Sequence, residues 1–239
     1  MLCMSTEGPS APRSARARVR AELTREILDA ARRQLATEGA AGLSLRAVAR
    51  ELGMVSSALY RYFPSRDDLL TALIIDGYEA LGAAVEEAEA GCPQSDLAGR
   101  YRATCRAVRA WALVHPHEYA LLYGSPVPGY RAPEATIGPA SRVTDGFVAQ
   151  LREAAAAGLS GPTLTETAPA VLHPDTRLVL EGVPDELAVR GLMVWTGLFG
   201  MVSFELFGQF NRVVDEPDAL FDAAVTRWAA FVGFAPSRR

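Results

Sequence analysis

Hydrogen-bonding and charged side chains gather on one side of a short predicted helix near residues 55 to 63. The apolar residues of this segment, spaced to face inward, are Val55, Ala58, Leu59 and Phe63. The opposite side carries Ser56, Ser57, Tyr60 and Arg61. Serine hydroxyls allow a close approach and bind bases or phosphates, a phenol reaches a phosphate, and a guanidinium can bind O6 and N7 of a guanine. The pattern predicts a helix that enters the major groove of double-stranded DNA.

Another basic side chain stands where the next helix begins. Ser65 is followed three positions later by Asp68, a capping-box pattern that predicts a helix start. Arg66 then lies in the first turn, where the helix dipole disfavours a cation. A phosphate bound there would be attracted by both the helix N-terminus and the guanidinium. Arg66 is therefore a candidate phosphate contact.

The charge distribution indicates a basic N-terminal region. Residues 1 to 75 contain 11 Arg and 8 acidic residues, although the whole chain has a net charge of -4. Residues 1 to 20 combine Arg with small residues and little that could pack, so we expect a flexible basic arm in which Arg18 and Arg20 contact DNA. The alternative is that these polar side chains are only the solvated faces of a small helical domain.

The remaining sequence offers no catalytic or metal-binding pattern. It has no nucleophile elbow, dinucleotide-binding glycine motif, P-loop or convincing carboxylate pair, so we expect neither an enzyme nor a cofactor. His115 and His117 flank a proline, and His173 is distant, which is too few ligands for a metal site.

Cysteine usage and hydropathy indicate the compartment. Three cysteines without a C-x-x-C pair suit a reducing cytoplasm. The longest uncharged run in a helical stretch, 14 residues between Arg190 and Glu205, is short for a membrane span. We expect a cytoplasmic protein, associated with the nucleoid when bound to DNA, with no membrane partner.

Helical periodicity with Gly and Pro punctuation predicts an all-α protein. Helices are expected at about 24–38, 45–52, 55–63, 65–90, 95–114, 116–123, 139–157, 185–213 and 217–233. Loops are expected at 124–135 and 158–184. The predicted organisation is a flexible arm at 1–20, a three-helix helix-turn-helix domain at 21–68 and a larger helical domain at 69–239.

The segments 43–53 (LSLRAVARELG) and 58–70 (ALYRYFPSRDDLL) resemble the TetR family of bacterial repressors, over about residues 21–72. The resemblance implies that the 45–52 helix supports the 55–63 recognition helix. It implies phosphate contacts at Ser44, Tyr60, Tyr62 and Arg66. It implies contacts to base edges or adjacent backbone at Arg46, Ser56, Ser57 and Arg61. Val55 and Tyr62 depart from the family's common Ser and His, which leaves the division between base and phosphate contacts open.

The resemblance also implies a C-terminal domain that dimerises through its last long helices and encloses an effector pocket. The 185–213 helix is apolar nearly all the way round, which favours a homodimer over the alternative of a helix wholly buried in its own domain. The candidate interface residues are Leu192, Phe204, Phe207, Phe210, Phe221, Val225 and Trp228.

Aromatic side chains are candidates for the walls of a ligand pocket, because small-molecule sites tend to be apolar with few polar groups. These candidates are Trp111, Tyr119, Tyr123, Phe147, Trp195 and Phe199. The alternative for each is an ordinary core position. No particular effector follows, beyond an apolar or aromatic small molecule.

Two functions are consistent with these observations. The first is a homodimeric repressor that a small-molecule effector releases from a palindromic operator. The second is a DNA-binding regulator without small-molecule input, which acts as an activator or architectural factor through a protein partner. A C-terminal domain without a cavity would favour the second.

Overall fold

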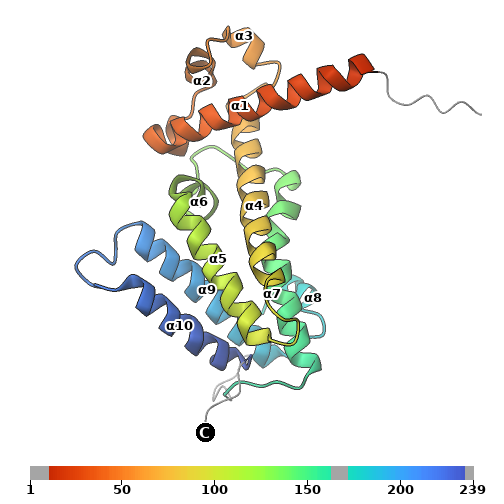
Figure 1. Cartoon of the computed structure of the whole chain (residues 1–239), viewed down its shortest axis with the longest axis vertical. Coiled ribbons are helices and arrows are strands. Elements are labelled where there is room, and N and C mark those ends of the chain that lie inside the picture. Colours follow the sequence, from red (N-terminus) through yellow and green to blue (C-terminus); the bar gives the residue numbers. More distant parts are fainter. Residues whose placement is uncertain (1–10, 163–171, 235–239) are drawn as a thin grey trace, which may run out of the picture. The chain divides into compact units, whose positions relative to one another are not determined.

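The computed structural model describes residues 11–162 and 172–234, without the side chains of residues 11–14, and all of its regular structure is helical (Figure 1). The chain divides into two compact units. The first comprises residues 1–74 with 126–131, and the second comprises 75–125 with 132–239. The boundary falls inside a helix and not at residue 68, since the buried Leu69 and Leu70 belong to the first unit.

The first unit begins with a long helix, α1 (Ala11–Gly42). Ile27, Ala31 and Leu35 are buried along one side of it, as the helical spacing predicts. Gly39 has φ +67°, a left-handed conformation that ends the regular helix. The expectation of a flexible arm is wrong for residues 11–20, which are helical. Ala and Arg, which predominate in residues 11–20, are good helix formers, so this segment continues α1 through helix propensity. Residues 1–10 lie outside the described residues.

Two short helices follow, α2 (Leu45–Glu51) and α3 (Ser56–Leu59). Gly53, with φ +64°, makes the turn between them. The helix predicted for 55–63 is therefore shorter than expected. Residues 60–62 continue as turns, with the amides of Tyr62 and Phe63 both donating to the carbonyl of Leu59. Pro64 contributes to this ending, because the residue before a proline is disfavoured in a helix.

Helix α4 (Arg66–Ala90) begins in the first unit and ends in the second. The predicted cap is present: the hydroxyl of Ser65 accepts the Asp68 amide at 3.1 Å and lies 2.6 Å from the Asp68 carboxylate. The remaining elements are α5 (Leu97–Val114), α6 (Pro116–Tyr123), η1 (Glu134–Thr136), α7 (Ile137–Ala156), α8 (Pro174–Val179), α9 (Asp185–Leu206) and α10 (Pro217–Val232).

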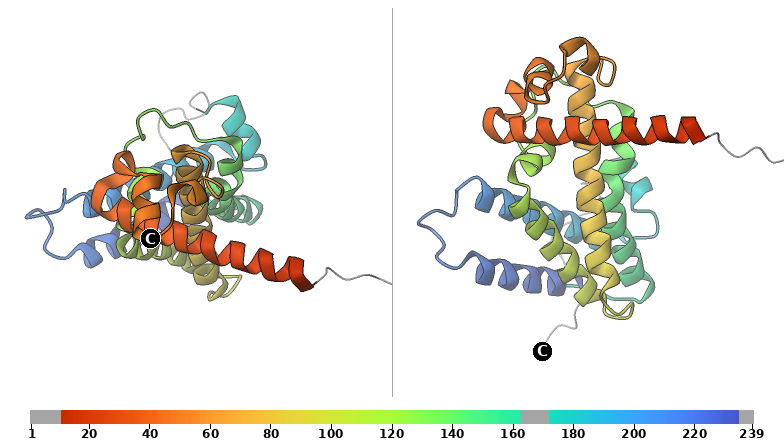
Figure 2. Two further views of the ribbon diagram at one scale, coloured as in Figure 1. Left: turned by 90° about the horizontal axis from the view of Figure 1, so that it is seen from above. Right: turned by 45° about the horizontal axis from the view of Figure 1, so that its top comes forward.

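The second unit is built around α9, which packs against α5, α7 and α10 (Figures 1 and 2). Its buried residues include Leu187, Val194, Leu198 and Val202. Two expectations need correction. The stretch 158–184 contains α8 in place of a continuous loop. Helix α9 ends at Leu206 and not at 213, because Gly208 adopts φ +78° and turns the chain.

Among the described residues, α9 is the one helix long and apolar enough by composition to cross a membrane. Part of its apolar surface forms the core of the second unit. Leu192, Met193 and Phe204 account for another part and are exposed. The hydropathy of α9 is therefore that of a core helix with an additional apolar side.

Candidate functional site

The polar side of α2 and α3 is open to solvent, while their apolar side forms the core of the first unit. Leu45, Val48 and Leu59 are buried. The exposed residues among the predicted contacts are Arg46, Ser57, Tyr60 and Arg61, and the half-buried ones are Ser44, Ser56 and Tyr62. Val55, which was expected to face inward, is 70% exposed because it is the extended residue that precedes α3.

Four of the predicted residues surround one open hollow. Its lining includes Ser44, Arg46, Tyr60 and Arg66. The N-terminus of α2 is held at its edge, since the side-chain oxygen of Gln34 accepts the Ser44 amide at 3.0 Å. The Ser44 hydroxyl does not cap α2. The hollow therefore combines a hydroxyl, a phenol and guanidinium groups, which are the usual donors to phosphate oxygens.

Arg66 also has partners within the chain, which the sequence did not predict. Its Nε donates to the carbonyl of Leu43 at 3.2 Å, and its Nη2 donates to the carbonyls of Ala40 and Ala41 at 2.7 and 3.3 Å. Unsatisfied carbonyls at the end of α1 attract a cation. The guanidinium at the start of α4 therefore has a structural role within the chain, and its predicted contact with a phosphate stays a prediction.

A second hollow gathers arginines from two elements of the first unit. Arg16 and Arg20 from α1 line it together with Arg61 and Tyr62. The Cζ atom of Arg20 lies 5.0 Å from the centre of the Tyr62 ring, a cation–π contact. None of the described residues that line this hollow is acidic. Converging guanidinium groups without a carboxylate attract a polyanion.

The residues that line this second hollow differ from the predicted DNA contacts at Arg16 and Arg18. Arg16 was not among the predicted contacts, although its spacing of four residues from Arg20 places both on one side of a helix. This spacing has a structural meaning only in a helix, and a flexible arm was expected there. Arg18 is exposed on α1 but does not line this hollow.

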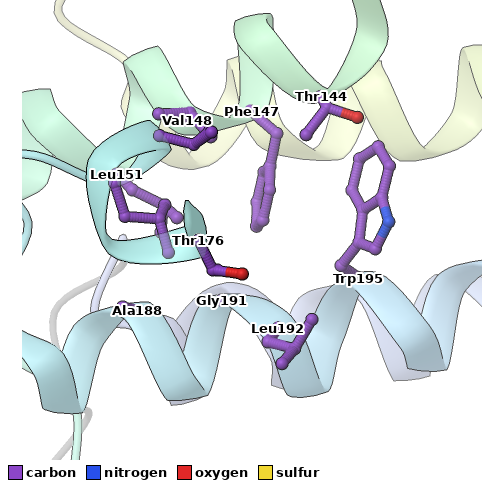
Figure 3. A pocket seen from close by; sticks show the side chains of 11 residues that line it. Thr144, Phe147, Val148, Leu151, Thr176, Ala188, Gly191, Leu192 and Trp195 are labelled. Atoms are coloured by element: carbon purple, nitrogen blue, oxygen red, sulfur yellow. The ribbon is translucent and has the colours of Figure 1, made fainter. Parts of the chain in front are cut away.

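The second unit contains a cavity of about 140 Å³ between α7, α8 and α9 (Figure 3). It is lined by Thr144, Phe147, Val148, Leu151, Thr176, Val179, Leu180, Ala188, Gly191, Leu192 and Trp195. The rings of Phe147 and Trp195 are stacked, with centres 5.6 Å apart. Among the described lining residues, none carries an ionisable group. The cavity is therefore suited to an apolar ligand.

Two of the six predicted pocket residues, Phe147 and Trp195, line this cavity, and the other four do not. The hydroxyl of the buried Tyr119 lies 3.0 Å from both the carbonyl oxygen of Phe199 and the hydroxyl of Ser203. Tyr123 packs on Phe199, with ring centres 4.3 Å apart, and burial raises the pKa of its phenol.

Trp111 is buried and stacks on His115. Trp111 and Tyr119 belong to the core of the second unit, and Tyr123 and Phe199 are half-buried against it, so none of the four lines this cavity. Periodicity shows that a side chain faces inward but not whether the space beside it is filled.

The predicted interface residues also divide into two groups. Leu192, Phe204 and Phe207 are 44%, 54% and 48% exposed, and Phe210 and Trp228 are half-buried. Phe221 and Val225 are buried in the core of their own unit, so their side chains are not available to a partner.

Two glycines of α9 allow close packing within the chain. A Cβ on Gly197 would lie 3.0 Å from the Trp228 ring of α10. A Cβ on Gly191 would lie 2.8 Å from Leu151 of α7.

Histidine and acidic residues do not assemble a metal site in the described part of the chain, where groups of three or more candidate ligands are absent. The Nδ1 atom of His115 instead lies 2.8 Å from a carboxylate oxygen of Glu118.

A helix-turn-helix unit with an exposed polar side, followed by a larger helical unit with an apolar cavity, defines a DNA-binding transcriptional regulator. The family model described as bacterial regulatory proteins, tetR family, matches residues 27–73, and the Tetracyclin repressor-like C-terminal domain matches residues 101–235. The chain belongs to the TetR family. These matches support a regulator and not an enzyme.

Relatives match over most of the chain. The HTH-type transcriptional regulator Rv1816 of Mycobacterium tuberculosis is 42% identical over 213 residues, which are 85% of this chain and 89% of that protein. The crystal structure of SCO4313 is 39% identical with a TM-score of 0.72, and the match covers 89% of this chain and 97% of that chain. A protein of unknown function from Rhodococcus sp. RHA1 is 27% identical with a TM-score of 0.66, over 87% of this chain and 94% of that chain.

Proposed function

We propose that this protein is a repressor that binds a palindromic operator as a homodimer and is released by a small-molecule effector. The observation that carries the proposal is the gathering of Arg16, Arg20, Arg61 and Tyr62 around one hollow beside the turn that follows α3. A dimer would place two such surfaces in successive major grooves, roughly 34 to 36 Å apart.

The contacts to DNA divide by reach and chemistry. Base edges are read by Arg46, Ser56, Ser57 and Arg61 on the outer side of α2 and α3. Phosphates are bound by Ser44, Tyr60 and Tyr62 and by the α1 arginines Arg16, Arg18 and Arg20. This division agrees with the exposure of Arg46, Ser57 and Arg61.

The homodimer forms through the exposed apolar side of α9 and the turn that follows it. Phe204 and Phe207 are about half exposed, and the rings of Phe204 and Phe210 lie 5.9 Å apart. Large exposed aromatic side chains favour burial against a second copy of the same surface. Leu192 and Trp228 extend this surface, while Phe221 and Val225 support it from inside.

The effector is an apolar or aromatic molecule that favours a conformation with a different spacing of the two recognition surfaces. The cavity between α7, α8 and α9 supports this function over a regulator without small-molecule input.

The experiment that tests the DNA-binding function is selection of genomic fragments by the purified protein, followed by affinity measurements at two salt concentrations. We expect a short palindrome bound by two chains, with affinity reduced at least tenfold by Tyr60→Ala. Arg50→Ala is a matched control for Arg46→Ala, because both arginines are exposed on α2 but Arg50 lines a different hollow, beside the Arg33–Glu51 ion pair.

An enriched palindrome that responds to Arg46→Ala and not to Arg50→Ala supports the assignment of the surface. Weak, salt-sensitive binding without an enriched sequence contradicts it and leaves a regulator that acts through a protein partner.

A further inference from the structure

Helix α1 is longer than the core of the first unit requires. Its first buried residue among the described side chains is Ile27, and residues 15–22 are all exposed. The N-terminal part of the helix projects beyond α2 and α3 (Figures 1 and 2). From Ala11 to Ile27 the helix rises about 24 Å, which is the length of about seven base pairs of DNA. The hydrophobic core does not account for this length.

The side of α1 that packs into the core changes its character along the helix. Ile27, Ala31 and Leu35 are buried on this side in the C-terminal half. Steps of seven and then four residues back from Ile27 place Arg20 and Arg16 on the same side. The apolar stripe of the core is therefore continued by two guanidinium groups.

The opposite side of this part of α1 is mixed in charge. It carries the exposed residues Arg18, Glu22, Arg25 and Asp29. Interspersed charges of both signs are typical of a solvated helix side. Positive charge without a neighbouring carboxylate is therefore a property of the side that carries Arg16 and Arg20.

The hollow lined by Arg16, Arg20, Arg61 and Tyr62 brings like charges together. Arg16 and Arg20 are four residues apart, a spacing at which like charges destabilise a helix. The Tyr62 ring, with its centre 5.0 Å from Cζ of Arg20, holds this guanidinium in place. The described lining has no carboxylate to offset the repulsion. A bound anion would offset it.

A DNA backbone fits these observations better than a small anion. Arg61 belongs to the lining of the hollow and also to the exposed polar side that is predicted to enter the major groove. DNA that contacts Arg61 therefore passes the hollow. A small anion could occupy the hollow, but it would leave the length of α1 unexplained.

We propose that residues 11–26 of α1 form a second DNA-binding element, which seats one phosphodiester between Arg16 and Arg20 and follows the sugar–phosphate backbone next to the bases read by α3. The inference rests on the DNA-binding part of the proposed function and not on its palindrome, dimer or effector. The element contributes affinity without reading sequence. Tyr62 positions Arg20 before DNA binds, which reduces the entropy lost on binding.

The first test uses a duplex of unselected sequence, so it needs no operator. Fluorescence anisotropy at several salt concentrations measures the affinity and its salt dependence. Arg16→Ala with Arg20→Ala should weaken binding at least tenfold at low salt and reduce the slope of log affinity against log salt by about 2 per bound chain. Arg25→Ala, on the opposite side of the same helix, is the matched control and should change the affinity less than twofold.

Equal losses in the double variant and the Arg25→Ala protein would overturn the element. Calorimetric titration with pyrophosphate tests the small-anion alternative. Pyrophosphate binding that is lost in the double variant, with DNA affinity unchanged, would assign the hollow to a small anion instead.

A charge-preserving exchange separates the phosphodiester seat from general attraction. Arg16→Ala combined with Ala17→Arg keeps the net charge but moves one guanidinium about 100° around the helix. Ala17 is exposed, so the fold should persist. We expect an affinity at least threefold below that of the unchanged protein. Equal affinities would contradict the seat, because any arginine in the segment would then suffice.

The helical form of the element is tested with Ala17→Gly and Ala21→Gly in one protein. This variant keeps every arginine, but glycine disfavours the helix that aligns Arg16 with Arg20. Circular dichroism should show less helix, and DNA affinity should fall at least threefold. Reduced helicity with unchanged affinity would show that a flexible basic arm is sufficient.

Hydroxyl-radical footprinting on a selected sequence locates the contact. At saturating protein, the double variant should lose protection at backbone positions next to the half-site and keep it at the half-site itself. Identical footprints would overturn the placement of α1. Failure to select any sequence would contradict the repressor function, whereas the unselected duplex still decides this inference.

Discussion

Arg66, the first residue of α4, donates a 2.7 Å hydrogen bond to the carbonyl of Ala40 near the end of α1. The same guanidinium also reaches the carbonyls of Ala41 and Leu43. A side chain that sequence reasoning assigned to DNA thus connects the first and last helices of the DNA-binding unit. Mutation of Arg66 is therefore expected to affect the stability of the fold.

Arg66→Ala should lower the free energy of unfolding by about 1 to 2 kcal/mol, because carbonyls at the end of α1 lose a charged donor. Urea unfolding followed by circular dichroism measures this. Arg66→Lys should restore only part of the loss, since an ammonium cannot reproduce the fork that reaches several carbonyls. A stable Arg66→Ala protein with a reduced salt dependence of DNA binding would favour the phosphate role instead.

The two arginines that flank Tyr62 should behave differently on DNA. Arg20→Ala should weaken binding to all sequences alike and reduce the slope of log affinity against log salt by about 1, as expected for one phosphate contact. Arg61→Ala should relax sequence preference at one operator position if it reads a base, at a cost of about 1 to 3 kcal/mol. Competition binding at two salt concentrations separates these effects.

Tyr62 itself has a ring and a hydroxyl that can be tested separately. Tyr62→Phe keeps the ring on which Arg20 rests, so the orientation of Arg20 should persist and only a phosphate contact should be lost. Tyr62→Leu removes both. Equal affinities of the Phe variant and the unchanged protein, with a loss in the Leu variant, would assign Tyr62 to positioning Arg20.

Phe204→Glu should convert the homodimer to monomers at micromolar concentration, because it places a charge on the exposed apolar side of α9. Sedimentation velocity measures the change, and circular dichroism checks that the fold persists. Leu178→Glu places the same charge on another exposed leucine and should leave the dimer intact. If both variants remain dimers, the interface lies elsewhere.

Alkaline pH should destabilise the second unit. Burial raises the pKa of the Cys105 thiol from 9.0 to about 12, and burial also raises the pKa of the Tyr101 phenol. The unfolded chain releases the thiol proton above pH 9 and the phenol proton above pH 10, while the folded chain retains both, so stability is full below pH 9 and falls as pH rises towards 12.

Each proton contributes a slope of up to about 1.4 kcal/mol per pH unit, which urea unfolding between pH 8 and 11 can measure. Cys105→Ala should make the decline shallower. An unchanged slope in this variant would show that Cys105 does not contribute.

Local patterns in the sequence were sufficient to predict much of the structure of the first unit. The capping residues Ser65 and Asp68, the turn at Gly53 and the outward side of α3 all follow from interactions between residues a few positions apart. Residues 43–53 and 58–70 indicated the TetR family for the same reason, because the family's motif consists of residues that are close together in the sequence. Helix α1 was underestimated because its first turns are stabilised by propensity and not by an apolar stripe.

The roles of residues distant along the chain were decided by tertiary structure. Sequence by itself determined the helical class, the helix-turn-helix and the apolar character of α9. It could not show that Arg66 faces the carbonyls of α1, that Phe221 is covered by its own chain, or that Trp195 lines a cavity whereas Tyr119 is buried in the core. Periodicity specifies only the direction of a side chain, whereas its partner and any unfilled volume depend on how separate helices pack in three dimensions.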